Sequence, residues 1–208
     1  MKRIAFFISG AGGNALNLFA ACRDGKLNAQ PVLAISSASK APGVERLRAA
    51  GLRVEVILRS GFDSDEKFSD ACFSCCEDSQ AGIICLCGFL KKLVAPERWM
   101  GRILNIHPGP LPRFGGLGMY GMAVHRAVLA AGVAGSGPTV HLVDNEYDHG
   151  KILAFEPVPI LPDDTPETLQ KRVYEAEMRL YPKALGDFLD QVALNPYQTL
   201  SKLSFHSS

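Results

Sequence analysis

The strongest constraint on this sequence is a regular alternation between short apolar, β-branched runs and segments of helical periodicity. The runs that we predict as strands cover residues 3–9, 31–36, 53–58, 82–87 and 102–106. The helical segments between them begin near Asn14, Gly43, Asp63 and Pro96. Strands that are apolar on both faces and joined by helices are typical of a parallel sheet covered on both sides. The first half therefore predicts an α/β fold with a doubly wound, mostly parallel sheet.

The pattern is less regular after residue 106. A segment rich in proline and glycine covers residues 108–121, and it is followed by a helix and by strands at 139–143 and 151–160. A long helix is predicted to start at Asp164-Thr165-Pro166-Glu167, because Asp or Thr can cap free amides and proline suits the first turn. We expect this helix to continue beyond Pro182.

Length and composition favour one domain with small-molecule partners. The chain has 208 residues, 47% of them hydrophobic, which is enough for a single sizeable core over residues 1–208. We divide it into a first half (1–100), a second half (101–190) and a peripheral tail (191–208). A net charge of +1 gives no basic surface for nucleic acid or an anionic membrane. The chain could pair with a second copy of itself, but no segment marks a dimer interface.

Two features favour a cytoplasmic protein. The first apolar run is cut short by Gly10, so it predicts a core strand rather than a signal peptide or a membrane span. The six cysteines lie in or beside apolar segments, which favours reduced thiols. Cys72 and Cys75 have C-x-x-C spacing but no second pair or nearby histidine, so we favour core packing and expect no metal site.

A glycine-rich turn, with Gly10, Gly12 and Gly13, joins the first strand to the first helix. Backbone amides at such a helix start can bind a phosphate. A P-loop is excluded because its lysine is missing. Gly10-x-Gly12-x-x-Ala15 fits a loose dinucleotide fingerprint, but no acidic residue follows the second strand at Ser37 to hold a ribose. A substrate monophosphate is favoured, with a turn that binds nothing as the alternative.

The most informative segment is Leu104-Asn105-Ile106-His107-Pro108. Residues two apart on a strand share a face, so Asn105 and His107 can act on the same atom. An amide can stabilise the oxyanion of acyl transfer and an imidazole can move a proton. A carboxylate in the turn 144–150 could pair with His107 and raise its pKa, whereas His141 could either support the site or lie in the core.

These motifs, at their spacing, closely resemble the phosphoribosylglycinamide formyltransferase family over residues 2–182. The segments that carry the resemblance are the glycine-rich turn and residues 87–90, 104–108, 136–141 and 147–150. The resemblance implies a Rossmann-like formyltransferase fold, with a nucleotide- and phosphate-binding half (1–100) and a catalytic and folate-binding half (101–190). It also implies transfer of the formyl group of 10-formyltetrahydrofolate, the co-substrate, to the amine of N1-(5-phosphoribosyl)glycinamide, in purine (IMP) biosynthesis, without a metal.

The resemblance assigns roles to three side chains. Asn105 would hold the formyl oxygen, His107 would donate a proton to the tetrahedral intermediate, and Asp148 would keep His107 protonated. Further residues would bind the two substrates. They are Gly12, Gly13 and Asn14 for the phosphate, Glu177 for the ribonucleotide, and Leu90, Lys91, Lys92, Leu93 and Asn105 for the folate.

Several positions depart from the common family pattern. The segment 113–121 is about four residues longer than usual, and its glycines indicate a loop that could act as a lid. Asp65 stands where many relatives carry a basic residue, so that ligand contact is not carried over. His149 stands where glycine is common, and we interpret it as exposed. His125 lies in an amphipathic helix and is predicted to be structural.

Other functions remain as alternatives. Methionyl-tRNA formyltransferases share the Asn-x-His and Asp arrangement, but we expect no tRNA-binding appendage in a chain that ends at residue 208. Hydrolysis of the formyl folate, a dinucleotide oxidoreductase and a nucleotide-binding module without catalysis are further alternatives. The set of Asn105, His107 and Asp148 argues against a module without catalysis, and the absence of an acidic ribose partner argues against an oxidoreductase. We expect no N-terminal regulatory domain of the kind that the hydrolase family carries.

Overall fold

The computed structural model describes residues 1–194 and comprises two compact units. We call Met1–Leu104 the N-terminal unit and Asn105–Ser208 the C-terminal unit. Of the tail predicted at 191–208, the first four residues end the last helix and the others lie outside the described residues.

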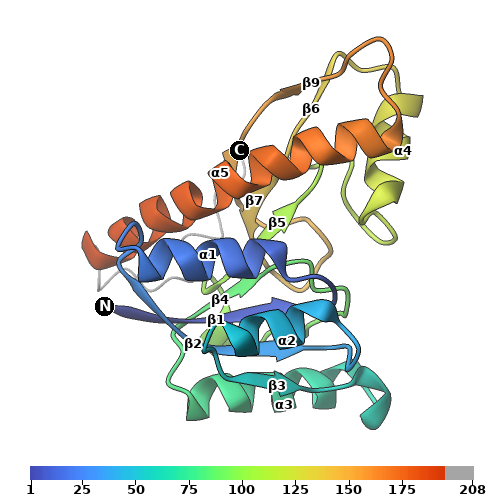
Figure 1. The fold of residues 1–208 in the computed structure, drawn as a ribbon. Coiled ribbons are helices and arrows are strands. Elements are labelled where there is room, and N and C mark those ends of the chain that lie inside the picture. The colour runs from blue at the N-terminus through green and yellow to red at the C-terminus, as the bar shows by residue number, and fades with distance from the viewer. Residues whose placement is uncertain (195–208) are drawn as a thin grey trace. The chain divides into compact units, whose positions relative to one another are not determined.

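The N-terminal unit contains four strands, three α-helices and two short 3-10 helices among its described elements (Figure 1). In chain order they are β1 (Lys2–Ile8), α1 (Gly13–Arg23), β2 (Ala29–Ser36), α2 (Pro42–Ala49), β3 (Val54–Val56), η1 (Arg59–Gly61), α3 (Asp65–Asp78), β4 (Ile83–Leu86) and η2 (Glu97–Trp99).

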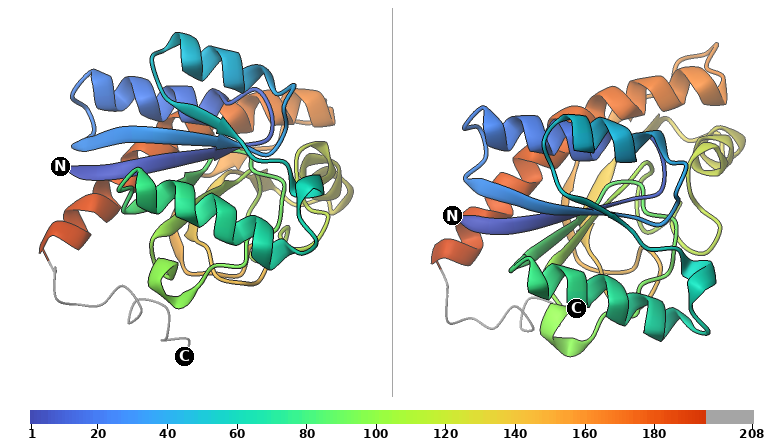
Figure 2. Two further views of the ribbon diagram at one scale, coloured as in Figure 1. Left: turned by 90° about the horizontal axis from the view of Figure 1, so that it is seen from below. Right: turned by 60° about the horizontal axis from the view of Figure 1, so that its bottom comes forward.

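The strands of this unit lie in the order β3-β2-β1-β4 and all pair in parallel. The first two crossovers move outwards from β1, and the third returns to its other side. Helices α1 and α2 cover one face of these strands and α3 covers the other (Figure 2). The predicted doubly wound, mostly parallel α/β fold is therefore confirmed.

Burial on both faces explains why the strands read as unbroken apolar runs rather than as alternating patterns. The β1 residues from Ile4 to Ile8 have no exposed surface, and β4 is buried throughout. On α3, Cys72 and Cys76 point into this core, and every cysteine of the chain is a free thiol. Cys75, the second member of the C-x-x-C pair, is only half-buried, so core packing accounts for Cys72 but not for the spacing.

One predicted helix of this unit is wrong. The segment after Pro96 forms only the single 3-10 turn η2, because the backbone is already extended at Met100 (φ −60°, ψ 135°) and turns left-handed at Gly101 (φ 71°). The turn is followed by β5 (Ile103–His107), which crosses into the C-terminal unit.

The glycine-rich turn packs directly on the start of α2. The amide of Gly43 donates to the carbonyl oxygen of Gly10 at 3.1 Å. A β-carbon at Gly43 would lie 2.7 Å from that oxygen and 2.7 Å from Cδ1 of Ile8. Gly12 adopts a φ of 69°, which favours glycine, and serves as the N-cap of α1. The close approach of two backbones therefore fixes the shape of the turn.

The C-terminal unit receives the end of β5 and contains two further helices and four further strands. They are α4 (Met122–Ala130), β6 (Gly135–Ser136), β7 (Thr139–Leu142), β8 (Ile152–Phe155), β9 (Val158–Pro159) and α5 (Pro166–Leu194). Strand β7 lies next to β5 in the sheet and pairs antiparallel with β8 (Figure 1).

The predicted strand at 151–160 is split in two. Pro157 cannot donate a backbone hydrogen bond, so the ladder with β7 ends and β9 pairs with β6 instead. The long helix α5 starts as predicted, with Thr165 and Thr168 bonding each other's amides in a reciprocal cap.

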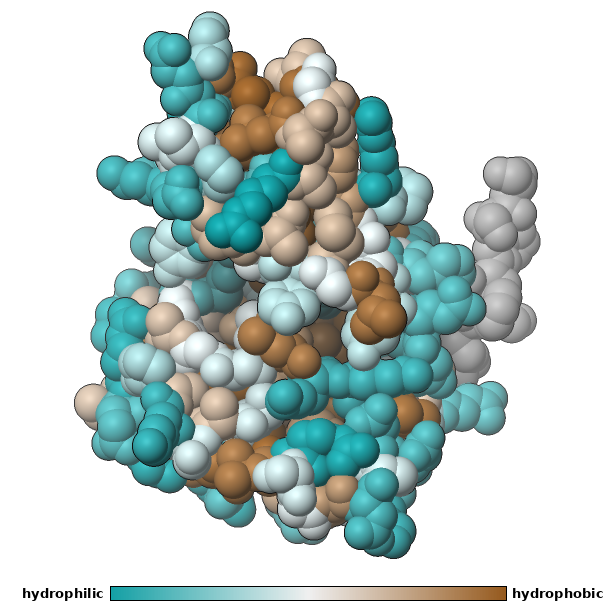
Figure 3. All heavy atoms as spheres, turned by 90° about the vertical axis from the view of Figure 1, so that its right-hand side faces the viewer, coloured by the Kyte–Doolittle hydropathy of each residue, from teal (hydrophilic) through white to brown (hydrophobic). Residues whose placement is uncertain are grey.

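A hydrophobic cluster holds α4 and α5 together. Its buried members are Phe114, Val124, Val128, Val158, Leu169, Val173 and Ala176. On the face drawn in Figure 3, hydrophobic side chains form small groups separated by hydrophilic ones. None of the helices described over residues 1–194 is long and apolar enough to cross a membrane.

Replacement of Gly43 by alanine tests the backbone contact beneath the glycine-rich turn. We expect Gly43→Ala to lower the free energy of unfolding by about 1–3 kcal/mol, the usual cost of forcing an extra carbon into a packed site. Urea unfolding measures the change. Gly61→Ala is the control, because a β-carbon at Gly61 meets nothing within 4 Å. Equal losses in the two variants would contradict a close contact at Gly43.

Candidate active site

Strand β5 delivers the two residues that the Asn-x-His motif singles out. Asn105 is half-buried and His107 is 3% exposed. Since they are separated by one residue on a strand, both side chains address the same face. The prolines that follow His107 end the regular structure at this point.

The predicted carboxylate reaches them from the turn between β7 and β8. Asp148 Oδ2 lies 3.4 Å from Nδ1 of His107, and Asp148 Oδ1 accepts a bond of 3.4 Å from Nδ2 of Asn105. The structure therefore brings Asn105, His107 and Asp148 together within the C-terminal unit. Asp148 adopts a φ of +54°, a left-handed conformation that is unfavourable for a residue with a β-carbon.

His141, on β7, is a fourth member of this cluster and belongs to the site as well as to the core. Its Nδ1 donates to the carbonyl oxygen of Leu142 at 2.8 Å. Its Nε2 lies 3.1 Å from Nδ2 of Asn105 and 3.5 Å from Oδ1 of Asp148. His141 therefore orients the amide of Asn105.

Two main-chain groups of the segment 113–121 complete the cluster. No sequence pattern predicts their role. The carbonyl oxygen of Phe114 accepts from Nε2 of His107 at 2.8 Å. The amide of Gly116 donates to Oδ2 of Asp148 at 3.1 Å. His107 therefore carries its first proton on Nε2, and its second can reside only on Nδ1, facing Asp148.

Burial and hydrogen bonding oppose each other at these groups. Burial works against ionisation of Asp148, but the contact with His141, the charge of His107 and the Gly116 amide together lower its pKa below the ordinary value. For His107, burial is the largest effect and lowers the pKa, although Asp148 and the Phe114 carbonyl counteract it.

Asp148 acts to raise the pKa of His107, which is the direction expected from the sequence. Removal of the imidazole from water outweighs this effect, so the pKa is lowered overall. The imidazolium forms when a proton arrives on Nδ1.

The segment 113–121 has one half packed on the site and one half exposed. Phe114 is buried, and a β-carbon at Gly115 would lie 2.8 Å from Cβ of Asp148. Beyond them, Leu117 is 83% exposed and Tyr120 is 57% exposed. The first half therefore supports the catalytic cluster, and a lid role is left only to the second half.

Thr139 clamps the proline-rich segment after His107. Its hydroxyl donates to the carbonyl oxygen of Gly109 at 2.8 Å and accepts from the amide of Leu111 at 3.3 Å. The residue is 1% exposed, so these bonds are shielded from water. The clamp fixes the chain just beyond the catalytic strand.

A further histidine, His125 on α4, is 1% exposed and its Nδ1 has no partner within the described residues. Burial, with a smaller contribution from the nearby His107 charge, lowers the pKa of His125 to about 4. It is therefore a neutral, packed side chain, as the sequence predicts.

The residues predicted to bind phosphate lie at the start of α1. Gly12 caps the helix without any side-chain bond, and the first turn contains no acidic residue. Gly13 begins the helix and Asn14 is buried. The backbone amides of this turn and the helix dipole thus favour an anion.

The predicted folate residues follow β4 in the N-terminal unit. Leu90, Lys91 and Lys92 are exposed, and the amide of Leu90 donates to Oγ of Ser9 at 2.8 Å. Leu93 is buried. In the C-terminal unit, Glu177 is a buried carboxyl residue on α5.

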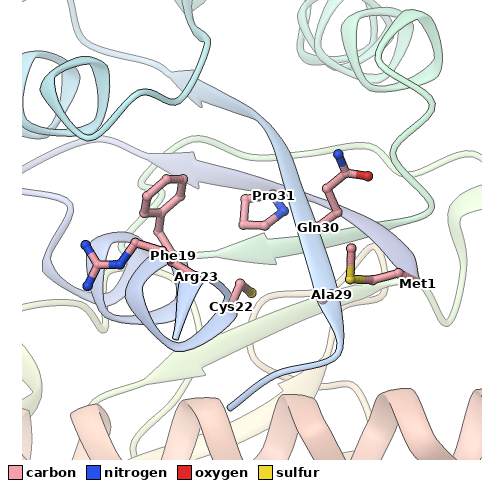
Figure 4. Close-up of a pocket in the computed structure, with 7 residues that line it drawn as sticks. All are labelled: Met1, Phe19, Cys22, Arg23, Ala29, Gln30 and Pro31. Atoms are coloured by element: carbon pink, nitrogen blue, oxygen red, sulfur yellow. The ribbon is translucent and has the colours of Figure 1, made fainter. Parts of the chain in front are cut away.

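Two other features of the described residues bear on ligands. Among residues 1–194, no group of three or more His, Cys, Asp or Glu side chains is arranged to hold a metal. An open pocket of about 220 Å³ lies between α1 and β2, and its lining contains none of the predicted site residues (Figure 4). Its walls are mainly apolar and include Phe19 and Pro31.

Comparison with known proteins gives one family. The family model for formyl transferase matches residues 2–185. The chloroplastic phosphoribosylglycinamide formyltransferase of Arabidopsis thaliana is 37% identical over 91% of this chain, which spans 66% of that protein. The trifunctional purine biosynthetic protein adenosine-3 of Drosophila melanogaster is 38% identical over 93% of this chain, which spans 14% of it.

A solved structure shares the fold. Glycinamide ribonucleotide transformylase 1 from Symbiobacterium toebii is 34% identical, with a TM-score of 0.86 over 92% of this chain and 89% of that one. The similarity to this structure therefore extends over most of both chains.

Replacement of Thr139 tests the clamp. We expect Thr139→Val, which keeps the shape but removes the hydroxyl, to lower the free energy of unfolding by about 1–3 kcal/mol, because it leaves a buried carbonyl and a half-buried amide without a partner. Chemical denaturation measures the loss. Thr139→Ser is the matched control and should retain most of the stability. A valine variant as stable as the serine variant would show that the clamp does not stabilise the fold.

The lowered pKa of His125 predicts that the folded protein loses stability in acid. Its folded pKa of about 4 lies below the unfolded value of 6.5, so its contribution is complete above pH 6.5 and disappears as the pH falls towards 4. The loss amounts to about 3 kcal/mol. Midpoints of urea unfolding across this range should therefore fall less steeply for His125→Leu than for the wild type. Parallel curves would refute the assignment.

Proposed function

The chain belongs to the formyl transferase family, and we propose that it is a phosphoribosylglycinamide formyltransferase. In this proposal it transfers the formyl group of 10-formyltetrahydrofolate to the amine of N1-(5-phosphoribosyl)glycinamide, in purine biosynthesis. The observation that carries the proposal is the convergence of an amide, an imidazole and a carboxylate in one partly buried cluster. The relatives' names indicate that the acyl group is a formyl group and that the acceptor is phosphoribosylglycinamide.

Asn105 is suited to hold the formyl oxygen. Its Nδ2 donates to His141 at 3.1 Å and, more weakly, to Asp148 at 3.4 Å. The longer bond is the one that a formyl oxygen would replace. As the amine attacks, the oxygen gains negative charge and the bond from Nδ2 strengthens, so the stabilisation is greatest in the transition state.

His107 and Asp148 are suited to move the proton. The attacking amine must lose a proton, and the folate nitrogen must gain one as the bond from the formyl carbon breaks. His107 can take the first proton on Nδ1, where Asp148 stabilises the imidazolium, and return it to the leaving nitrogen. The lowered pKa of His107 favours this exchange because the imidazolium gives the proton up readily.

The binding roles follow the same proposal. Gly12, Gly13 and Asn14 would bind the phosphate at the start of α1, and Glu177 would contact the ribonucleotide. The folate would lie against residues 90–93 and Asn105. Alignment of two bound reactants removes much of the entropic barrier, about 7–11 kcal/mol in favourable cases.

We further assign phosphate binding to the first half of the chain and catalysis to the second, which is the division expected from the sequence. The partners in this proposal are small molecules rather than nucleic acid, and the location is cytoplasmic. The net charge of the chain is +1, which gives no basic surface for a polyanion.

An assay with glycinamide ribonucleotide and 10-formyltetrahydrofolate tests the function directly. We expect equimolar formylated ribonucleotide and tetrahydrofolate, followed by absorbance and by mass spectrometry. Formation of tetrahydrofolate with free formate and no formylated product would instead identify a hydrolase. The absence of any turnover would refute the proposal.

Two substitutions test the catalytic roles. We expect His107→Ala and Asp148→Asn each to lower kcat at least tenfold, within the range of about 10²–10⁴ that general acid–base groups contribute. Asp163→Asn, which changes an exposed carboxylate of the same unit, is the control and should keep its activity. Circular dichroism and melting temperatures establish that each variant is folded. Near-normal turnover in both catalytic variants would contradict the mechanism.

A further inference from the structure

The turn that carries Asp148 contains an ion pair that the proposed reaction does not use. Nδ1 of His149 lies 2.9 Å from Oδ2 of Asp144. Whereas the Asp148 side chain points inwards and is 13% exposed, its neighbour His149 points outwards and is 67% exposed. The two consecutive residues thus face opposite sides of the same turn.

The pair spans the part of the turn where the backbone is strained. Asp148 has a φ of +54°, and such a conformation persists in a residue with a side chain only when the surrounding contacts hold it. On its C-terminal side, a β-carbon at Gly150 would lie 2.0 Å from the carbonyl oxygen of Leu142. The chain therefore has little freedom immediately after His149.

Asp144 ties both ends of this strained segment. Its Oδ1 accepts from the amide of Glu146 at 2.9 Å, and its Oδ2 accepts from His149. One carboxylate therefore fixes the start of the turn through the main chain and the end through an imidazole. Asp148 lies between these two attachment points, directly before the second.

We infer that the Asp144–His149 pair positions Asp148 against His107, so that the occupancy of the competent catalytic cluster depends on this pair. The inference rests on the proposed function for its activity readout. Asp144 and His149 are positioning residues in this assignment, since neither contacts His107 or Asn105 in a described bond.

The charges around His149 give the pH range over which the pair acts. The groups that face it are Asp144, through both the hydrogen bond and its charge, and Glu146, and together they raise the pKa of His149 above its ordinary value. A raised histidine pKa means that the stabilisation is complete below the ordinary value and is lost as the pH rises through the raised one. The positioning effect is therefore strongest in mild acid and disappears in alkali.

The test compares kcat of the wild type and His149→Gln from about pH 6 to about pH 9. We expect the variant to be about two- to fivefold slower at the acid end, which is the scale of an exposed ion pair, and equal to the wild type at the alkaline end. The Michaelis constant for the ribonucleotide should change less than twofold. A rate ratio that stays constant with pH would overturn the inference.

Asp144→Asn and the double variant provide a second, independent arm. Asp144→Asn should give the same pH-dependent ratio of wild-type to variant kcat. Adding His149→Gln to it should cause no further loss of kcat, because each substitution alone already breaks the same ion pair. Fully multiplicative losses would overturn the inference. Lys183→Gln breaks an exposed ion pair on α5 and is the matched control, expected to show no change at any pH.

Nuclear magnetic resonance of the histidine rings separates this inference from the proposed function. The ring signals of His107 should shift at about pH 6 in His149→Gln but not in Lys183→Gln, whether or not the chain forms product. A wild type without formyl transfer but with the shift would refute the function and retain the positioning role. Unchanged His107 signals in a chain that does transfer formyl would refute the positioning role and retain the proposed function.

Discussion

The C-terminal unit is organised around one half-buried carboxylate that stays ionised. Burial of Asp148 costs free energy, and this cost is offset by the ring of His141, the charge of His107 and the amide of Gly116. Each of these groups comes from a different segment, so the pairing of β5 with β7, the turn before β8 and the start of the segment 113–121 must all be in place at once. Charge compensation thus couples the fold to the chemistry.

The motif residues of the site could be predicted because they follow simple geometric rules. Asn105 and His107 share a face through the two-residue period of a strand, and the fold class follows from apolar runs that alternate with helices. A carboxylate near the site could be predicted because Asp148 lies in a polar turn after a strand. The choice of Asp148 as the partner of His107 rests on the resemblance to a family. His141 could not be assigned from sequence, since a buried histidine on a strand fits a core and a site equally well.

The remaining features depend on main-chain groups and on competing energies. A carbonyl at Phe114 and an amide at Gly116 are present in any sequence, so no residue type reveals that they bond to His107 and Asp148. The pKa of His107 was expected to rise because only the carboxylate could be considered, whereas the depth of burial depends on the tertiary structure. The helix expected after Pro96 failed for a local reason, the left-handed turn at Gly101.

The use of backbone groups in the segment 113–121 has an evolutionary consequence. Only residues 114–116 bond to the catalytic cluster, and Leu117 and Tyr120 extend into solvent beyond them. Insertions after Gly116 can therefore accumulate without altering any catalytic contact, as long as the chain returns to α4. The loop is a place where descendants of this protein can vary in length, and so acquire new recognition surfaces beside an unchanged reaction centre.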